Sequence, residues 1–247
     1  MEVHAHTHTP RKKWTHYLWE FLMLFLAVFC GFLAEYQLEH KIEQGKEKQY
    51  IQSMVEDVNK DIGALDSVIN YQTFIIPGLD SLCLQCYRFK KGDSEVKDLY
   101  RLHKKYGLKT DVLIEFNDKT LTQLKNAGGM RLIRNQIAAD GITLYDNNIK
   151  KIKSHEGIYG DVIVISYHLS LKIFNRAYYR RGVEDNKPAN EFGNISLLDD
   201  NMKMLIEYGN TVESLKNVLV DYILLLKEMK EQAYGLMQTL KTEYHLK

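Results

Sequence analysis

One apolar segment near the start of the chain, Tyr17 to Ala34, limits the possible folds more than any other feature. A helix of this length, at about 1.5 Å per residue, reaches roughly 27 Å and crosses most of the hydrocarbon core of a bilayer. Three basic residues, Arg11, Lys12 and Lys13, stand just before it. The sequence therefore predicts a membrane protein with one span.

A removable targeting signal is the alternative interpretation of this segment. Signal peptidase prefers small residues at positions −1 and −3, and a cut after Ala34 would place Phe32 at −3. A lipoprotein signal ending at Cys30 would have Phe29 where a small residue is needed. These mismatches favour an uncleaved anchor.

The charges on either side of the segment indicate its orientation. Basic residues lie close to its N-terminal side, whereas Glu35, Glu39 and Glu43 come first on the other side. The positive-inside rule then places the N-terminus in the cytoplasm. We expect a cytoplasmic His-rich tail at 1–16, a transmembrane helix at 17–36, a helical stalk at 37–76 and a helical periplasmic domain at 77–247. So short a tail leaves no room for a cytoplasmic kinase or cyclase, which argues against a receptor that signals alone.

The composition indicates an all-α protein. Three prolines in 247 residues, with few turn pairs, favour long helices over a strand-rich sandwich. The 33 basic and 32 acidic residues give a net charge of +1, so nothing points to a nucleic-acid partner. We expect the transmembrane helix to continue into the stalk, followed by a bundle of long helices that ends in a coiled-coil-like helix.

Hydrophobic periodicity places the first helices. Apolar residues recur at alternating steps of four and three after the span, at Ile51, Val55, Val58, Ile62, Leu65 and Ile69. Pro77 should end this helix, because it lacks an amide donor and disfavours helix at the residue before it. Further helices are expected at 78–89 and from Ser94, which would be the N-cap. Residues 107–118 are the only candidate for an extended segment, and a loop would suit their length as well.

The second half of the chain is predicted to be helical too. After a turn at residues 127–129, the pattern indicates one very long helix or two stacked ones, and then a polar loop at 181–194. The final helix has the most regular seam, formed by Val212, Leu215, Leu219, Tyr222, Leu226, Met229, Ala233, Leu236 and Leu240. Such a seam packs either on its own chain or on a second copy. We expect these stripes to form a bundle core in preference to a cofactor cavity.

One face of the span is a candidate helix–helix interface. It consists of residues at heptad spacing with a small-residue centre, namely Glu20, Leu24, Ala27, Gly31 and Ala34. Small residues let two helix backbones approach closely in a membrane. Glu20 would lie at the rim of that interface, or alternatively at headgroup level in an aromatic belt with Trp14, Tyr17 and Trp19.

The remaining motifs give little support for catalysis. Cys83 and Cys86 form a CxxC, but on a helix face shared with apolar residues, so core packing is favoured over redox chemistry, with oxidation between the two left open. The tail residues His4, His6 and His8 could chelate a metal weakly, yet no fourth ligand completes a site. A basic and aromatic patch, Arg176 to Arg181, suits lipid headgroups, an acidic partner or simply a solvated helix end. No ExxH, HExxH, GxSxG or phosphate-loop motif occurs, so the sequence predicts no enzyme and no cofactor.

Two passages carry a resemblance to a known group. The first is WEFLMLFLAVFCGFLAE followed by GKEKQYIQSMVEDVNKD, with its acidic E-D-x-x-x-D element; the second is LKNAGGMRLIRN, Leu124 to Asn135. Together they resemble uncharacterised single-pass membrane proteins of Bacteroidota, although this chain has Ala-Gly-Gly where a Ser-Gly-Asn type turn is more usual. The resemblance implies an inner-membrane protein with a helical periplasmic domain and supplies no reaction. In the second passage, Gly128 or Gly129 would supply a positive φ, Arg131 and Arg134 would remain exposed, and Leu132 and Ile133 would dock the turn.

Two functions remain in competition. The preferred hypothesis is a membrane-anchored, self-associating helical scaffold or accessory subunit, whose partners are the bilayer, a second copy and other envelope membrane proteins. The alternative is a periplasmic sensor or ligand-binding bundle that signals to a separate membrane partner.

Overall fold

The computed structural model describes residues 13–126, 128–179 and 195–246, and in these residues the protein is all-α, as the sequence predicted. The long helices are α1 (Trp14–Tyr87), α4 (Gln136–Ile173) and α5 (Met202–Glu243). Shorter ones are α2 (Asp93–Leu102), α3 (Lys119–Asn126) and the single turns η1 (His103–Gly107), η2 (Gly129–Leu132) and η3 (Arg176–Tyr179). The histidines of the tail and the polar loop at 181–194 lie outside the described residues.

The chain divides into two units, residues 1–49 and residues 50–247. In the first unit the described residues from 14 onward belong to α1, and every side chain from 13 to 39 is exposed. Within the described part of the chain, α1 is the one helix long and apolar enough to cross a membrane. The apolar residues of this unit thus cover the whole circumference of the helix and have no protein core to enter.

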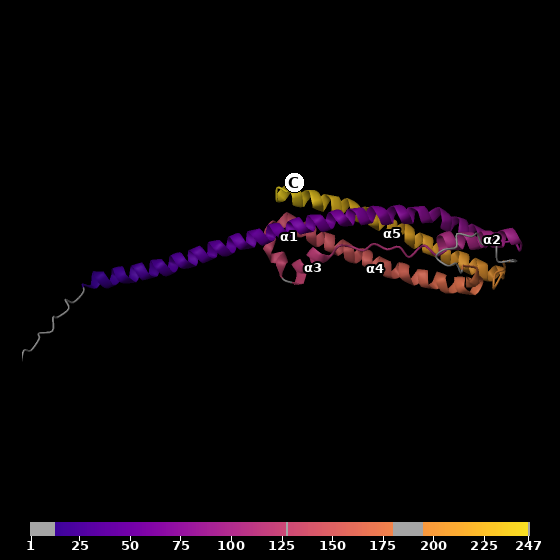
Figure 1. Ribbon diagram of the computed structural model, residues 1–247, viewed down its shortest axis with the longest axis horizontal. Helices are drawn as coiled ribbons and strands as arrows, with labels where there is room; N and C mark the ends of the chain where they lie inside the picture. The colour runs from indigo at the N-terminus through magenta and orange to yellow at the C-terminus, as the bar shows by residue number, and fades with distance from the viewer. Residues whose placement is uncertain (1–12, 127, 180–194, 247) are drawn as a thin grey trace, which may run out of the picture. The chain divides into compact units, whose positions relative to one another are not determined.

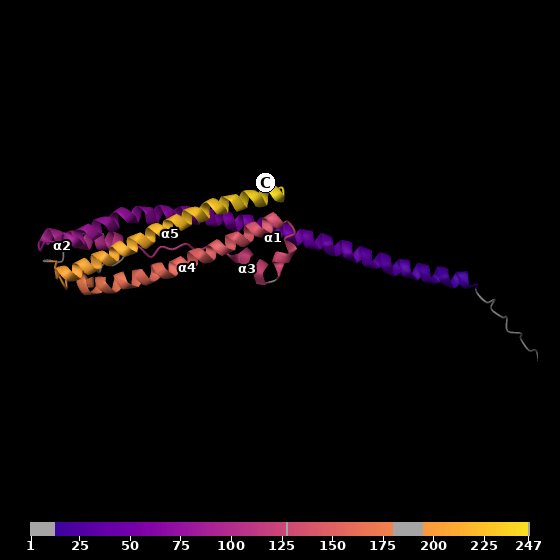
Figure 2. The ribbon, with the colours of Figure 1, turned by 180° about the vertical axis from the view of Figure 1, so that it is seen from behind.

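The second unit is a bundle built on three long helices. Figures 1 and 2 show the part of α1 in this unit, α4 and α5 lying side by side, and α4 and α5 run antiparallel. The stripe predicted after the span is the α1 contribution to the core, with Ile51, Val58 and Leu65 fully buried. Residues 50–76, assigned to a stalk by the sequence, are therefore part of the bundle.

Pro77 does not end the first helix, contrary to the prediction, because α1 continues to Tyr87 and no separate helix begins at 78. An interior proline costs about 3 kcal/mol in helix stability. The apolar stripe continues across it, and Ile75, Leu79 and Leu82 are all buried at 1% exposure or less. We attribute the unbroken helix to this burial, which offsets the cost of the missing hydrogen bond.

The start of α2 also differs from the prediction. The residue at the N-cap is Gly92 in an extended conformation, with no side-chain hydrogen bond to the helix. Ser94 lies inside the first turn, where its hydroxyl donates to the carboxylate of Glu95 at 2.6 Å. Ser94 is therefore not the N-cap of α2.

Residues 109–118 have no regular structure and thread between the long helices as the thin magenta trace of Figure 1. Side chains of the bundle bind the backbone of this segment. The hydroxyl of Tyr71 donates to the carbonyl of Lys109, that of Tyr159 donates to the carbonyl of Thr110, and the amide of Ile114 donates to the hydroxyl of Tyr222. A buried segment without a helix or sheet ladder needs such partners, which explains why several core positions are tyrosine.

Candidate functional site

The residues predicted to form a membrane-helix interface lie on an exposed part of α1. Glu20, Leu24, Ala27, Gly31 and Ala34 are all exposed, and a side chain added at Gly31 would meet no atom within 4 Å. Glu20 contacts His16 one turn earlier, with 3.0 Å between its Oε1 and the imidazole Nε2. The face is available to lipid or to another helix.

The C-terminal seam is used within the chain. Leu215, Leu219, Tyr222, Leu226, Met229 and Leu236 are each buried to 6% exposure or less in the single bundle. Of the two packing modes that the sequence left open, the structure has the seam packed on its own chain. This seam therefore gives no support to self-association.

The turn in the second passage, Leu124 to Asn135, has a structural role. Gly128 has a φ of 63°, which L side chains rarely adopt, while Gly129 packs against Leu124. Ile133 is buried and Arg131 and Arg134 are exposed. The passage ends at Asn135, which caps α4 by accepting a hydrogen bond from the amide of Ala138 at 3.0 Å.

The acidic element of the first passage, which includes Asp57 and Asp61, binds residues near the start of α3, and sequence reasoning missed these contacts. Asp61 is fully buried and accepts from the amide and the side chain of Asn117 at 2.7 and 2.8 Å and from the hydroxyl of Tyr145 at 2.7 Å. Asp57 accepts from the amide and the hydroxyl of Thr120 at 3.1 and 2.6 Å. These two carboxylates tie α1 to the start of α3. The only sequence signal was their position beside the apolar stripe, where a solvated carboxylate would be out of place.

A third buried carboxylate belongs to α4. Glu156 accepts from the hydroxyl of Tyr222 at 2.8 Å and pairs with Lys153 at 2.8 Å, and Lys153 also donates to the carbonyl of Ile114. Its hydrogen bonds join α4, α5 and the threaded segment. With its oxygens engaged, Glu156 has the contacts of a structural residue.

The cysteine pair lies in the core. Cys83 and Cys86 are free thiols at 2% and 0% exposure. Burial, the largest cause in both cases, raises the pKa of each thiol to about 12. Thiols in this state are poor nucleophiles, because the thiolate is the reactive form.

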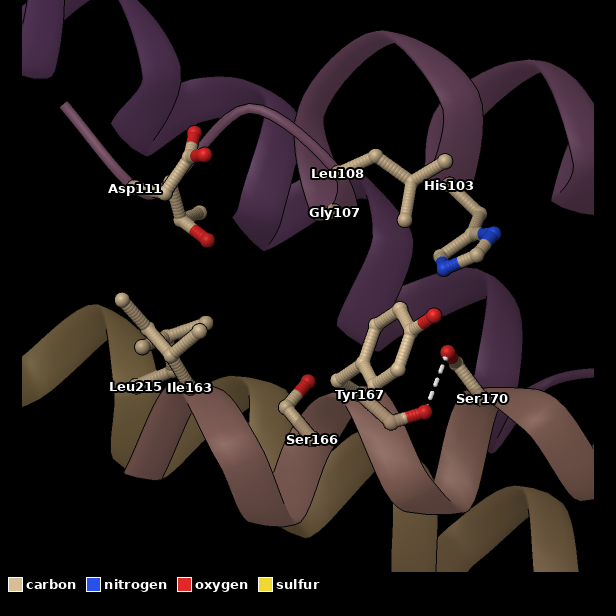
Figure 3. A pocket seen from close by; sticks show the side chains of 10 residues that line it. His103, Gly107, Leu108, Asp111, Ile163, Ser166, Tyr167, Ser170 and Leu215 are labelled. Atoms are coloured by element: carbon tan, nitrogen blue, oxygen red, sulfur yellow. Dashed lines mark hydrogen bonds between the residues drawn. The ribbon is translucent and has the colours of Figure 1, made fainter. Parts of the chain in front are cut away.

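One pocket among the described residues combines buried polar and apolar groups and has a volume of about 180 Å³ (Figure 3). One wall is formed by η1 and the start of residues 109–118, which are called the threaded segment. The facing wall is formed by the C-terminal half of α4, and α5 contributes one residue. Its lining consists of His103, Gly107, Leu108, Thr110, Asp111, Ile163, Ser166, Tyr167, Ser170 and Leu215. Asp111 and Tyr167 are exposed, so the cavity opens to solvent beside them.

His103 forms one wall of this cavity. Its ring stacks on Phe174, with ring centroids 4.0 Å apart, and its Nδ1 lies 2.6 Å from the hydroxyl of Tyr179. Burial first, and then the nearby Arg176, lower the pKa of the imidazole to about 3. The cavity is thus walled by a neutral imidazole, which can donate or accept a hydrogen bond.

Three buried polar atoms in the described residues lack a hydrogen-bond partner of good geometry, although the hydroxyl of Tyr208 has Ser166 as a polar neighbour. The hydroxyl of Tyr208 lies 3.2 Å from where a Cβ of Gly107 would stand. The Nε of Arg176 belongs to a guanidinium that binds Ser170, and Gln72 Oε1 belongs to a side chain that holds the carbonyl of Val112. Each such atom costs about 1–3 kcal/mol. Tyr208 and Arg176 adjoin the cavity, the first beside Gly107 and Ser166 and the second through Ser170.

The predicted basic and aromatic patch is only partly described. Arg176 lies over the rings of Tyr167 and Tyr179 at 5.0 and 5.5 Å from their centroids, so it belongs to the surroundings of the cavity. Residues 180 and 181 of the patch lie outside the described residues. No group of three His, Cys, Asp or Glu side chains able to hold a metal occurs in the described part of the chain.

Comparison of the chain with family models, with curated proteins and with solved structures finds no match.

Proposed function

We propose that the chain is a single-pass membrane protein of the cell envelope whose helical bundle serves as a scaffold or accessory subunit of a larger assembly. The observation that carries the proposal is the fully exposed apolar circumference of α1 between Tyr17 and Ala34. An exposed surface of this size and composition is stable in lipid and costly in water. The N-terminus is cytoplasmic in this proposal and the bundle lies in the periplasm, since the basic residues precede the span.

The interior of the bundle is consistent with a structural role. Its buried carboxylates Asp57, Asp61 and Glu156 are engaged in hydrogen bonds that join helices to the threaded segment. Its thiols are protonated and enclosed. These groups hold the fold together and are not free for chemistry.

Self-association is proposed through the span, because the C-terminal seam is occupied within the bundle. The face with Ala27, Gly31 and Ala34 is exposed, and Gly31 leaves room for a second backbone. Cross-linking of the full chain in native membranes tests this point. Wild type should form dimers or higher species and Gly31→Leu should reduce them, with Gly45→Leu as a matched control that leaves them unchanged. A monomer for both wild type and Gly31→Leu would remove self-association from the proposal.

The anchor and its orientation have a direct test. The chain should stay in the membrane pellet after carbonate washing, and a cysteine-reactive reagent that does not cross the inner membrane should label an added cysteine at the C-terminus. Release by carbonate, or a C-terminus found in the cytosol, would contradict the proposal.

A second candidate function is favoured by the cavity beside His103. A ligand-binding bundle that passes a signal to a separate membrane partner would need such a cavity, with polar groups that converge on it. Purification from native membranes in mild detergent followed by native mass spectrometry distinguishes the two functions. A retained small molecule favours the ligand-binding bundle, and a retained protein partner without a small molecule favours the scaffold.

A further inference from the structure

The size of the cavity beside His103 limits what can enter it. An apolar protein cavity of about 150 Å³ holds a benzene molecule, and this one measures about 180 Å³. A ring of that size with one or two further heavy atoms is therefore the expected upper limit. Larger molecules would have to extend past Asp111 and Tyr167 into solvent.

The charge of the lining selects among molecules of this size. Asp111 is the one lining residue with a formal charge, because His103 is neutral and the others are hydroxyl, glycine, aromatic or aliphatic residues. Arg176 lies outside the lining, where its guanidinium donates to the hydroxyl of Ser170 at 2.8 Å. The lining thus offers a carboxylate to a cation and only neutral donors to an anion.

The lining groups are also divided in space. In Figure 3 Asp111, on the threaded segment, and the aliphatic side chains of Ile163 and Leu215, on the facing helices, lie at one end of the cavity on opposite walls. Ser166, Ser170 and His103 lie toward the other end. A molecule that places an ammonium group at Asp111 has aliphatic surface on the facing wall of the cavity for a hydrocarbon part. Its far end reaches hydroxyl and imidazole groups that can hydrogen-bond.

From this arrangement we infer that the cavity is a binding site for a small organic amine, with Asp111 as the partner of its ammonium group. This inference refines the second candidate function. It is independent of the scaffold proposal, so its failure would leave the membrane anchor and the self-association untouched.

The test uses the full chain in mild detergent and three probes of one shape, namely benzylamine, benzyl alcohol and benzoate, which carry charges of +1, 0 and −1 at neutral pH. Their dissociation constants are measured by NMR titration. Benzylamine should bind about three- to fivefold more tightly than benzyl alcohol, the size of effect expected for a partly exposed ion pair. Benzoate should bind most weakly.

Three variants assign the effect to this cavity. Asp111→Asn should lower the affinity for benzylamine to that for benzyl alcohol, and Asp221→Asn, an exposed carboxylate on α5, should change neither affinity. Ser166→Leu should fill the cavity and remove binding of every probe; should circular dichroism show that it misfolds, the smaller Ser166→Val takes its place. Because partition into the micelle is the same for all variants, differences between them report on the cavity.

Three outcomes would overturn the inference: equal or tighter binding of benzoate, binding that survives in a folded Ser166 variant, or no measurable binding of benzylamine by wild type. The last outcome would identify the cavity as a hydrated gap in the bundle.

Discussion

Two stretches of α1 show what separates a candidate membrane span from a core segment. Residues 17–34 are apolar around the whole helix, and every side chain is exposed. Residues 51–69 carry one apolar stripe, which is buried, and their aspartates at 57 and 61 are buried with it. The first pattern has no complementary surface in the described chain and belongs to a helix that is long and apolar enough to cross a membrane. The second is completed by residues that arrive from distant parts of the sequence.

The carboxylates of the two stretches differ in the same way. Glu20 is half exposed, at 52% of its side chain, and pairs with His16 one turn away. Asp61 is fully buried and holds three hydrogen bonds from residues 56 and 84 positions further along the chain. The carboxylate of Glu20 thus pairs with a residue one turn away, whereas the carboxylate of Asp61 depends on partners that the tertiary structure brings to it.

The largest effect is expected at Asp61. Asp61→Ala leaves the amide of Asn117 and the hydroxyl of Tyr145 without an acceptor inside the bundle, and each unpaired group costs about 1–3 kcal/mol. We expect a loss of about 3–5 kcal/mol in the free energy of unfolding, measured by urea denaturation of the full chain in detergent. Asp66→Ala, which removes a surface pair with Lys230 at 2.5 Å, should cost at most about 1 kcal/mol. Equal losses in both variants would remove the distinction between buried and exposed carboxylates.

A charged residue introduced into residues 17–34 tests the first of the two stretches. Leu26→Arg should disfavour membrane insertion by about 3 kcal/mol, the cost of arginine at the centre of a transmembrane helix. A glycosylation-reporter insertion assay measures the change. Leu224→Arg, at an exposed position of α5, is the control and should leave both insertion and folding intact. Normal insertion of Leu26→Arg would mean that the segment is not held in the hydrocarbon core.

The pH dependence of stability should follow His103. The pKa of this imidazole is lowered to about 3 in the fold, against an ordinary value of 6.5, so below pH 6.5 the unfolded chain binds a proton that the folded chain excludes. Its contribution to stability is complete above pH 6.5 and is lost as the pH falls toward 3. Between pH 7 and pH 5 the free energy of unfolding should decrease by about 2 kcal/mol from this group, at about 1.4 kcal/mol per pH unit.

Denaturation at both pH values measures the effect, with His103→Gln as the comparison. Glutamine can still hydrogen-bond to Tyr179 but does not titrate, so that variant should lose the His103 part of the pH dependence. An identical slope in wild type and variant would show that His103 is not the source.

The smallest effect is expected at a glycine of α1. A Cβ at Gly63 would meet no atom within 4 Å, so Gly63→Ala should stabilise the bundle by about 0.5–1 kcal/mol through helix propensity. The same change at Gly78 should destabilise, because a Cβ there would overlap the ring of Tyr106 at 2.1 Å. Thermal unfolding of the two variants measures the opposite signs, and a stabilised Gly78→Ala would show that Tyr106 does not pack there.

Much of the fold could be predicted from local patterns. The stripe at 51–69 and the seam at 212–240 were read from helical spacing, and both are buried in the structure. The continuation of α1 through Pro77 could not be predicted, because it depends on how deeply Ile75 and Leu79 are buried by other segments. The predicted N-cap of α2 was wrong, because the helix begins at Asp93, one residue before Ser94, and Gly92 is at the N-cap.

The candidate site could be predicted from the sequence less well than the fold. His103 was one of several scattered histidines in the sequence, and its neutral state follows from burial by Phe174 and Tyr179, which lie more than seventy positions away. The cysteines of the CxxC are packed in the core, and the glycine turn has a structural role. No spacing in the sequence marks Asp111, Ser166 and His103 as neighbours.

The sequence by itself determined which stretches are helical and which helix can enter a membrane, because both properties depend on the order of polar and apolar residues within a few turns. Only the tertiary structure decided that the C-terminal seam faces its own chain, that Asp57 and Asp61 bind the start of α3, and that a cavity forms beside His103. Those outcomes depend on contacts between residues far apart in the chain, and helical periodicity carries no information about which stripe meets which.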